Sequence, residues 1–275
     1  MDIAGKNAVV TGGASGIGRA LCLALAEQGA AGVVVADVDA GGAAQTAAAV
    51  EAAGHKALAV PTDMSSEPDV TALVARAEEA FGPVGLFCSN AGIIVDGGVE
   101  VADEAWSRIW AINVQAHVYA ARALLPGMLA RGEGYLVITA SAAGLLTELG
   151  SAPYSVTKHA AVGLAEWLSI TYGDQGLRVS CLCPQAVSTN LIATSHREVS
   201  DMPAERAGLG TPQASVDGVL TADDVAACVI QAIGDERFLI LPHPDVAVYE
   251  QRRAGDRDRW LRGMRRLQAR LSGPG

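Results

Sequence analysis

Short apolar runs alternate with longer amphipathic segments along most of this chain. The runs are four to six residues long and rich in valine, leucine and alanine, which is typical of strands buried on both faces of a sheet. We predict strands at Ala8–Thr11, Gly32–Ala36, Ala57–Val60, Val84–Cys88, Tyr135–Ala140 and Val179–Cys183.

Helical periodicity fills the intervals between these runs. Apolar residues recur at helical spacing from Ile17 onward until Gly29 stops the pattern. Further helices are predicted over about 40–53, 67–80 and 103–130, and from Tyr154 to about Tyr172. Strands alternating with helices of this length predict an α/β fold with a doubly wound parallel sheet of the Rossmann type. Because no linker or repeat interrupts the pattern, we expect a single domain over residues 1–243, with a C-terminal helical extension over 244–275.

A glycine-rich loop follows the first predicted strand and opens the first predicted helix. It reads Gly12-Gly13-Ala14-Ser15-Gly16-Ile17-Gly18. Glycines let backbone N–H groups approach a pyrophosphate, and the helix N-terminus adds partial positive charge. The loop differs from the G-x-G-x-x-G fingerprint because three residues separate Gly12 from Gly16, so a tight turn without a ligand is the alternative. Its position at the first strand favours a dinucleotide site.

Asp37 ends the second predicted strand, 25 residues after Gly12. A carboxylate at this place can accept hydrogen bonds from the 2′-hydroxyl of an adenosine ribose, and it repels a 2′-phosphate. The alternative is an ordinary turn residue followed by Asp39 as a helix N-cap. We favour the ribose role, which predicts NAD as the cofactor.

Tyr154 and Lys158 are four residues apart, so on a helix they project from the same face. Ser141 lies thirteen residues before Tyr154, at the end of a predicted strand. A nearby ammonium favours phenolate, so we expect Lys158 to lower the pKa of Tyr154 from its usual value of about 10. A serine hydroxyl can hydrogen-bond a carbonyl or alkoxide oxygen. The alternative is a helix face with a lysine directed to solvent.

Ligands of parallel sheets bind beyond the carboxyl ends of the strands. The residues that stand at these ends are the glycine loop, Asp37, Asp63, Asn90, Ser141 and the pair Cys183-Pro184. Their convergence predicts a dinucleotide site beside an acid–base group.

Composition narrows the classes of function. The net charge of −10 argues against general nucleic-acid binding. The five cysteines form no C-x-x-C pair and the five histidines have no metal-binding spacing, so we expect reduced thiols and no metal site. No apolar run approaches the roughly 20 residues of a membrane span, and the N-terminus shows no secretory signal. We therefore expect a cytoplasmic protein.

In combination and in order, the motifs resemble those of the short-chain dehydrogenase/reductase family. Thr11, Gly12, Gly16 and Gly18 match its T-G-x-x-x-G-x-G loop, and Asn90-Ala91-Gly92 matches its N-A-G element. The family's catalytic tetrad is matched by Asn113, Ser141, Tyr154 and Lys158, and its P-G-x-V-x-T segment by Pro184, Val187 and Thr189. Ser89 and Gln185 depart from the pattern, where asparagine and glycine are usual. The resemblance covers roughly residues 5–241.

The resemblance implies a role for each matched residue. Tyr154 is the general acid/base, while Lys158 lowers its pKa and hydrogen-bonds the nicotinamide ribose. Ser141 positions the substrate oxygen, and Asn113 holds a water in a proton relay. Gln185 either places an amide in the substrate pocket or points to solvent. The expected cofactor contacts are Gly12, Ala14, Ser15, Gly16, Ile17, Gly18, Asp37, Asp63, Met64, Asn90, Ala91, Gly92, Tyr154, Lys158, Pro184, Val187 and Thr189.

The implied activity is hydride transfer between NAD(H) and a secondary alcohol or ketone. Residues 190–218 are expected to form a substrate lid, and their apolar content favours an apolar substrate. Asp37 and Ser15 argue against a ketoacyl-carrier-protein reductase that uses NADPH. The intact tetrad argues against a non-catalytic, dinucleotide-sensing binding protein. The resemblance also implies a homo-oligomer, either a tetramer or a dimer.

The tail lies outside the family motifs. Trp260, Met264, Leu267 and Leu271 form an apolar stripe at helical spacing. Residues 251–270 carry eight arginines and two aspartates, a net of +6, which leaves −16 on the rest of the chain. Such a helix can bind a membrane surface or remain solvated. We favour packing on the protein's own acidic assembly, on a neighbouring subunit or over its substrate cleft.

Overall fold

The structure is a computed structural model that describes residues 1–189, 191 and 217–272. The predicted substrate lid at 190–218 lies outside the described residues, except for residues 191, 217 and 218.

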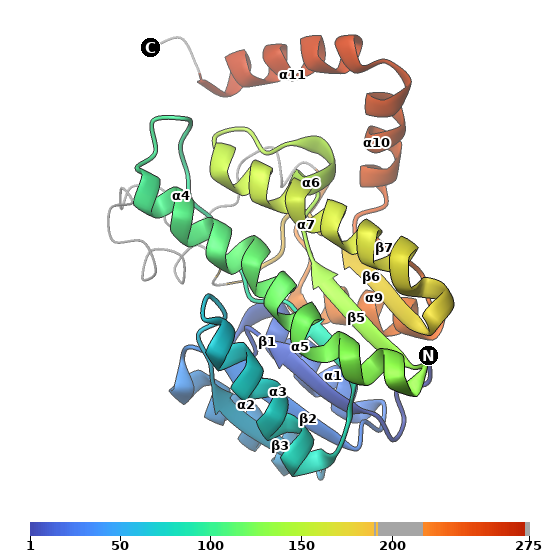
Figure 1. Ribbon diagram of the computed structural model, residues 1–275. Helices are drawn as coiled ribbons and strands as arrows, with labels where there is room; N and C mark the ends of the chain where they lie inside the picture. Colours follow the sequence, from blue (N-terminus) through green and yellow to red (C-terminus); the bar gives the residue numbers. More distant parts are fainter. Residues whose placement is uncertain (190, 192–216, 273–275) are drawn as a thin grey trace.

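A parallel sheet of seven strands, counted over the described residues, forms the centre of the molecule (Figure 1). Its order is β3-β2-β1-β4-β5-β6-β7. The strands are β1 (Asn7–Thr11), β2 (Gly32–Asp37), β3 (Ala57–Pro61), β4 (Val84–Ser89), β5 (Gly134–Thr139), β6 (Leu177–Leu182) and β7 (Leu239–Ile240). The winding direction reverses between β1 and β4, and this reversal leaves a crevice at the carboxyl ends of those two strands.

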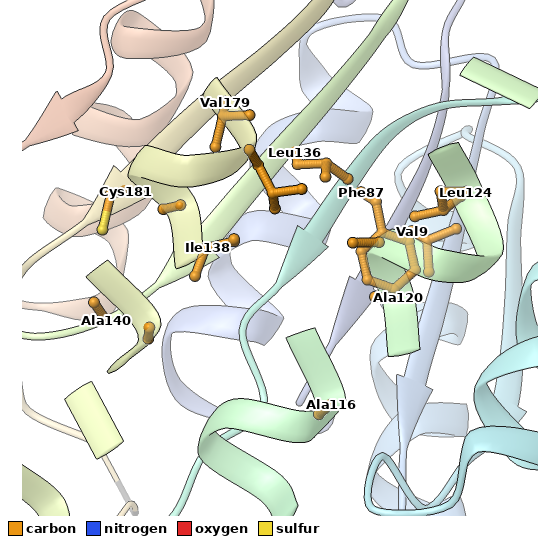
Figure 2. Packing of buried hydrophobic residues seen from close by; sticks show 14 of the residues in the cluster. Val9, Phe87, Ala116, Ala120, Leu124, Leu136, Ile138, Ala140, Val179 and Cys181 are labelled. Atoms are coloured by element: carbon orange, nitrogen blue, oxygen red, sulfur yellow. The ribbon is translucent and has the colours of Figure 1, made fainter. Parts of the chain in front are cut away.

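Helices cover both faces of the sheet, as a doubly wound fold requires. One face is covered by α1 (Gly16–Glu27), α2 (Ala40–Ala52) and α9 (Ala222–Gly234), and the other by α3 (Glu67–Phe81), α5 (Ala116–Arg131) and α7 (Ala152–Tyr172). Successive strand residues point to opposite faces, so Val34 joins one core while Val33 and Val35 join the other. Figure 2 shows Phe87 of β4 packed beside Val9 of β1 and Leu124 of α5.

A π-helical turn and a four-residue helix stand on the reaction side of the crevice. The helix α4 (Asp103–Trp110) passes through a π-helical turn, η1 (Ala111–Gln115), into α5. The four-residue α6 (Ala143–Leu146) follows β5 and leads to α7. The turn η2 (Gly173–Gln175) connects α7 to β6.

The chain ends in two helices, α10 (Asp245–Gly255) and α11 (Arg257–Ser272). Figure 1 shows them at the end of the molecule that carries α6, away from the amino ends of the strands. In the part of the chain that the structure describes, no helix is long and apolar enough to cross a membrane.

The predicted fold class is confirmed: a doubly wound parallel sheet with helices at its C-terminal end. Each of the six predicted strands is present, within two residues of the predicted ends. The predicted helix over 103–130 is present but divided by the π-helical turn. Asp39 caps α2, because its side chain accepts a hydrogen bond from the N–H of Gly42.

Candidate active site

A cavity opens over the carboxyl ends of the strands and collects most of the predicted site residues. Those that line it are Gly12, Ser15, Gly16, Ile17, Asp37, Asp63, Met64, Asn90, Ala91, Gly92, Ser141, Tyr154, Lys158, Pro184, Val187 and Thr189. Ala14, Gly18 and Asn113 lie outside this lining, but each is bonded to or packed against a residue that belongs to it, namely Asp37, Gly12 and Ile93 respectively.

The glycine loop is a tightly packed backbone turn between β1 and α1. A Cβ atom on Gly18 would lie 2.0 Å from the carbonyl oxygen of Gly12, so only glycine fits there. Asp37 ties the loop to the end of β2, because its carboxylate accepts hydrogen bonds from the N–H groups of Ala14 (3.0 Å) and Asp39 (2.9 Å). Asp37 therefore shapes the loop and also lines the cavity.

A second network joins the ends of β1, β4 and β5. The Thr11 hydroxyl accepts hydrogen bonds from the N–H groups of Asn90 (2.9 Å) and Ala91 (3.0 Å). The Asn90 amide donates to the Thr11 carbonyl and accepts from the Thr139 hydroxyl. This explains a threonine at Thr11, because one side-chain oxygen holds the start of the Asn90-Ala91-Gly92 segment.

The predicted acid–base pair lies on the first turns of α7. Ser151 caps this helix by accepting a hydrogen bond from the N–H of Tyr154. The Lys158 ammonium lies 5.6 Å from the centre of the Tyr154 ring and donates to the Thr139 carbonyl at 2.9 Å. Ser141 follows β5 and lies in the same cavity. The structure thus brings three of the four predicted catalytic side chains to one cavity.

The electrostatics of this site differ from the expectation. Burial raises the pKa of the Tyr154 phenol to about 12, and a hydrogen bond from Ser141 offsets only part of that rise. Burial also lowers the pKa of Lys158 to about 8. The prediction that Lys158 lowers the tyrosine pKa is therefore wrong for this structure. The Lys158 ammonium donates to the Thr139 carbonyl, and burial is the largest cause of the raised pKa of the phenol.

Asn113 lies in the π-helical turn and is fully buried. Its side chain accepts a hydrogen bond from the N–H of Ile93 and donates to the carbonyl of the same residue, both at 2.9 Å. A Cβ atom on Gly92 would lie 3.3 Å from both Asn113 Oδ1 and Lys158 Nζ. Gly92 therefore lies close to both the Asn113 and the Lys158 side chains. The polar atoms of Asn113 are nevertheless bonded to the backbone of Ile93. Water held by Asn113 remains a prediction.

Sequence reasoning missed Arg108, which reaches the cavity from α4. Its guanidinium pairs with Asp63 at 3.6 Å and donates to the Ser65 hydroxyl at 2.6 Å. Burial opposes ionisation of Asp63, but hydrogen bonds from Ser65 and the Arg108 charge together hold its pKa below the usual value. No local sequence signal marks this pair, because it joins residues of separate elements.

Apolar side chains that the sequence did not single out form part of the cavity wall, namely Ile93, Ile112 and Leu191. Gln185 lines the cavity, which agrees with an amide in the pocket rather than in solvent. Its N–H donates to His243 Nδ1 at 3.2 Å. Its backbone is thereby fixed to the segment after β7.

The described residues fit a bound nicotinamide dinucleotide. The backbone packing at Gly18 leaves a loop surface without side chains, at the N-terminus of α1, where a pyrophosphate is favoured. The Asp37 carboxylate at the end of β2 suits a ribose diol. No group of three or more histidine, cysteine, aspartate or glutamate side chains within the described ranges could hold a metal ion.

Comparison with known proteins agrees with this architecture. Residues 6–200 match the family model for short chain dehydrogenases. A crystal structure of a short chain dehydrogenase/reductase from Burkholderia phymatum in complex with NAD matches with a TM-score of 0.85 and 35% identity, covering 94% of this chain and 96% of that chain. The chain therefore belongs to the short-chain dehydrogenase/reductase family, a family of NAD(P)-dependent oxidoreductases.

Curated relatives of similar sequence are also alcohol dehydrogenases by name. The chain is 36% identical to 1-deoxy-11-beta-hydroxypentalenate dehydrogenase of Streptomyces exfoliatus, over 90% of this chain and 86% of the relative. It is 34% identical to cyclohexanol dehydrogenase of Acinetobacter sp., over 80% of this chain and 89% of the relative. The chain is thus an enzyme of the short-chain alcohol dehydrogenase type.

Proposed function

We propose that this enzyme transfers a hydride between NAD(H) and a secondary alcohol or ketone on an alicyclic ring. The observation that carries the proposal is that Ser141, Tyr154 and Lys158 share one cavity with the glycine loop and Asp37. A dinucleotide bound on that loop would therefore meet an acid–base group in the same cavity.

The names of three relatives support a ring alcohol. They are cyclohexanol dehydrogenase, cis-4-hydroxycyclohexanecarboxylate dehydrogenase and 3beta-hydroxysteroid dehydrogenase 2, each between 32% and 36% identical to this chain. The walls of the cavity support the same class, because Ile93, Ile112 and Leu191 offer apolar contacts to a carbocycle.

Tyr154 is proposed as the group that moves the proton at the substrate oxygen. With its pKa raised to about 12, the phenol is neutral at neutral pH and suited to donate a proton to a developing alkoxide. Ser141 would orient the substrate oxygen by a hydrogen bond, and Lys158 would hold the site's positive charge beside the phenol. The cofactor, when bound, supplies the hydride acceptor or donor.

NAD is proposed over NADP because Asp37 presents a carboxylate where the adenosine ribose is expected. Its two oxygens face the N–H groups of Ala14 and Asp39. The Asp37 position therefore holds a negative charge that a 2′-phosphate would have to approach.

The test is Tyr154→Phe, assayed by the absorbance of NADH against a panel of alicyclic secondary alcohols and their ketones. We expect turnover to fall by about 10²-fold or more, with NADH affinity near that of the wild type. Tyr172→Phe is the matched control, because Tyr172 ends the same helix far from the cavity. A folded Tyr154→Phe variant that retains its turnover would exclude the proposed role.

A further inference from the structure

His117 is a buried histidine to which the proposed reaction gives no role. It lies on α5, four residues after Asn113, and is only 2% exposed. Its Nδ1 atom lies 2.6 Å from the Oγ atom of Ser89, a buried residue at the end of β4. Ser89 is one of the two positions that depart from the family motifs. The departure therefore falls on the residue that contacts this histidine.

The second ring nitrogen of His117 is unusual for a buried polar atom. Its Nε2 atom is buried and has no hydrogen-bond partner among the residues that the structure describes. An unpaired buried polar atom costs stability, and most such atoms in folded proteins have a partner. The nitrogen therefore needs an explanation, and a neighbouring charge offers one.

That charge is the ammonium of Lys158. Asn113 lies about one helical turn before His117, and its Oδ1 atom would lie 3.3 Å from a Cβ atom on Gly92. The Nζ atom of Lys158 would lie 3.3 Å from the same Cβ atom. Burial and, as a smaller cause, the charge of Lys158 lower the pKa of His117 to about 3. The imidazole is therefore neutral at neutral pH and lies within the field of the ammonium.

A neutral imidazole carries one proton, and the Lys158 charge favours one of its two positions. A proton on Nε2 would be an unpaired N–H group near a positive charge. A proton on Nδ1 is instead donated to the Ser89 Oγ atom, and it leaves a lone pair on Nε2 that an ammonium attracts. Because a serine hydroxyl can accept as well as donate, the Nδ1–H form satisfies both contacts.

We propose that His117 is a positioning residue for the reaction: Ser89 holds it as the Nδ1–H tautomer, and the Nε2 lone pair stabilises the Lys158 ammonium. The Thr139 carbonyl accepts a hydrogen bond from the same ammonium at 2.9 Å, so the imidazole adds a second dipole from α5. Fixed dipoles act more strongly on a charge in a buried site than in water. The inference rests on the proposed function, since it concerns how Lys158 keeps its charge during the reaction.

Three other titratable groups lie near Lys158, namely the Tyr154 phenol on the same helix and the thiols of Cys181 and Cys183 on β6. Burial raises the pKa of Tyr154 to about 12. The hydrogen bond with Cys181 raises the pKa of the Cys183 thiol well above its usual value. Both groups are therefore neutral near pH 8, where burial places the pKa of Lys158. A change near this pH on substitution of His117 would report the ammonium.

The first test is ¹⁵N NMR of the histidine side chains, which reads the tautomer without substrate or turnover. The chain has five histidines, and the signal of His117 is the one that His117→Leu removes. We expect a neutral ring in the Nδ1–H form from pH 8 down to pH 5, and a mixture of tautomers in Ser89→Ala. A ring in the Nε2–H form, or one that gains a proton above pH 5, would overturn the proposal.

The second test compares the pH profile of kcat for ketone reduction in the wild type and in the double variant Ser89→Ala/His117→Leu. Because apolar groups replace both partners, the double variant should fold with a Tm within a few degrees of the wild type. Without the imidazole the ammonium loses its proton more readily. We therefore expect the alkaline fall of kcat to move to lower pH by about half a unit or more. His117→Gln returns an acceptor and should remove most of this shift.

Ser180→Ala is the matched control and should leave the profile unchanged. Ser180 is a fully buried serine bonded to Tyr135, and neither residue lines the cavity. An alkaline limb at the same pH in the wild type and in the folded double variant would overturn the proposal and leave the pair a structural role. Absence of turnover in the wild type would contradict the proposed function, whereas the tautomer read by NMR would still support or overturn this inference.

Discussion

The cofactor preference can be tested at Asp37 with one substitution. Asp37→Asn removes the negative charge but keeps an oxygen that can accept from the N–H of Ala14, so the glycine loop retains its tie to β2. Asp39→Asn is the matched control, because Asp39 is a neighbouring carboxylate engaged in capping α2.

The size of the expected cofactor preference follows from the Coulomb repulsion between Asp37 and a 2′-phosphate. Asp37 is partly exposed, so the effective dielectric lies between that of a protein surface and that of water. For a phosphate charge about 5 Å away, the repulsion is then about 1–3 kcal/mol, which corresponds to roughly 5- to 150-fold in cofactor preference. Salt should reduce the preference, because partly exposed charges are screened.

The assay is kcat/KM for NAD(H) and NADP(H) with one substrate, followed by absorbance of the reduced cofactor. We expect the wild type to prefer NAD(H) by this factor and Asp37→Asn to lose most of the preference. Asp39→Asn should change the ratio less than twofold. The reasoning is refuted if the wild type prefers NADP(H), or if the Asp37→Asn ratio equals that of the wild type.

Three further outcomes follow from the packing of the site. Gly92→Ala should lower kcat several-fold with a small change in Tm, because the new Cβ would lie 3.3 Å from Lys158 Nζ; equal kcat would show that the ammonium tolerates displacement. Gly18→Ala should lower the free energy of unfolding in urea by at least about 2 kcal/mol, because its Cβ would lie 2.0 Å from a backbone oxygen. Lys158→Met should stabilise the protein most below pH 8, and its advantage of up to about 3 kcal/mol should shrink toward pH 10.5. Between these values the unfolded wild type binds more protons than the folded one, so a constant advantage in pH-dependent urea unfolding would contradict the buried charge.

The sequence predicted the sheet well because its first six strands read as continuous apolar runs. Most of them are buried on both faces, while the edge strand β3 is only half-buried. Strand β7 was not predicted, because two residues are too few to form a recognisable apolar pattern. The site residues at strand ends, such as Asp37 and Asn90, could be placed because parallel strands end at the same edge.

Other features depend on contacts that no local pattern records. The π-helical turn at Ala111–Gln115 is a change of hydrogen-bond partner within a continuous helical sequence. The raised pKa of Tyr154 results mainly from burial. The spacing between Tyr154 and Lys158 predicts only that these two side chains share a helix face, and it contains no information about burial. The tie from Lys158 to the Thr139 carbonyl uses a backbone atom, which every residue type provides.

Lysine is scarce in this chain, and the few that exist lie in very different surroundings. The sequence contains three, Lys6, Lys56 and Lys158, against seventeen arginines. Lys6 pairs with Glu133 near the surface, Lys56 is exposed, and Lys158 is buried in the active-site cavity. Selective ¹⁵N-lysine labelling would therefore give three backbone amide resonances, one of them from the catalytic helix. That resonance would follow ligand binding at the reaction centre without a crowded spectrum or an introduced probe.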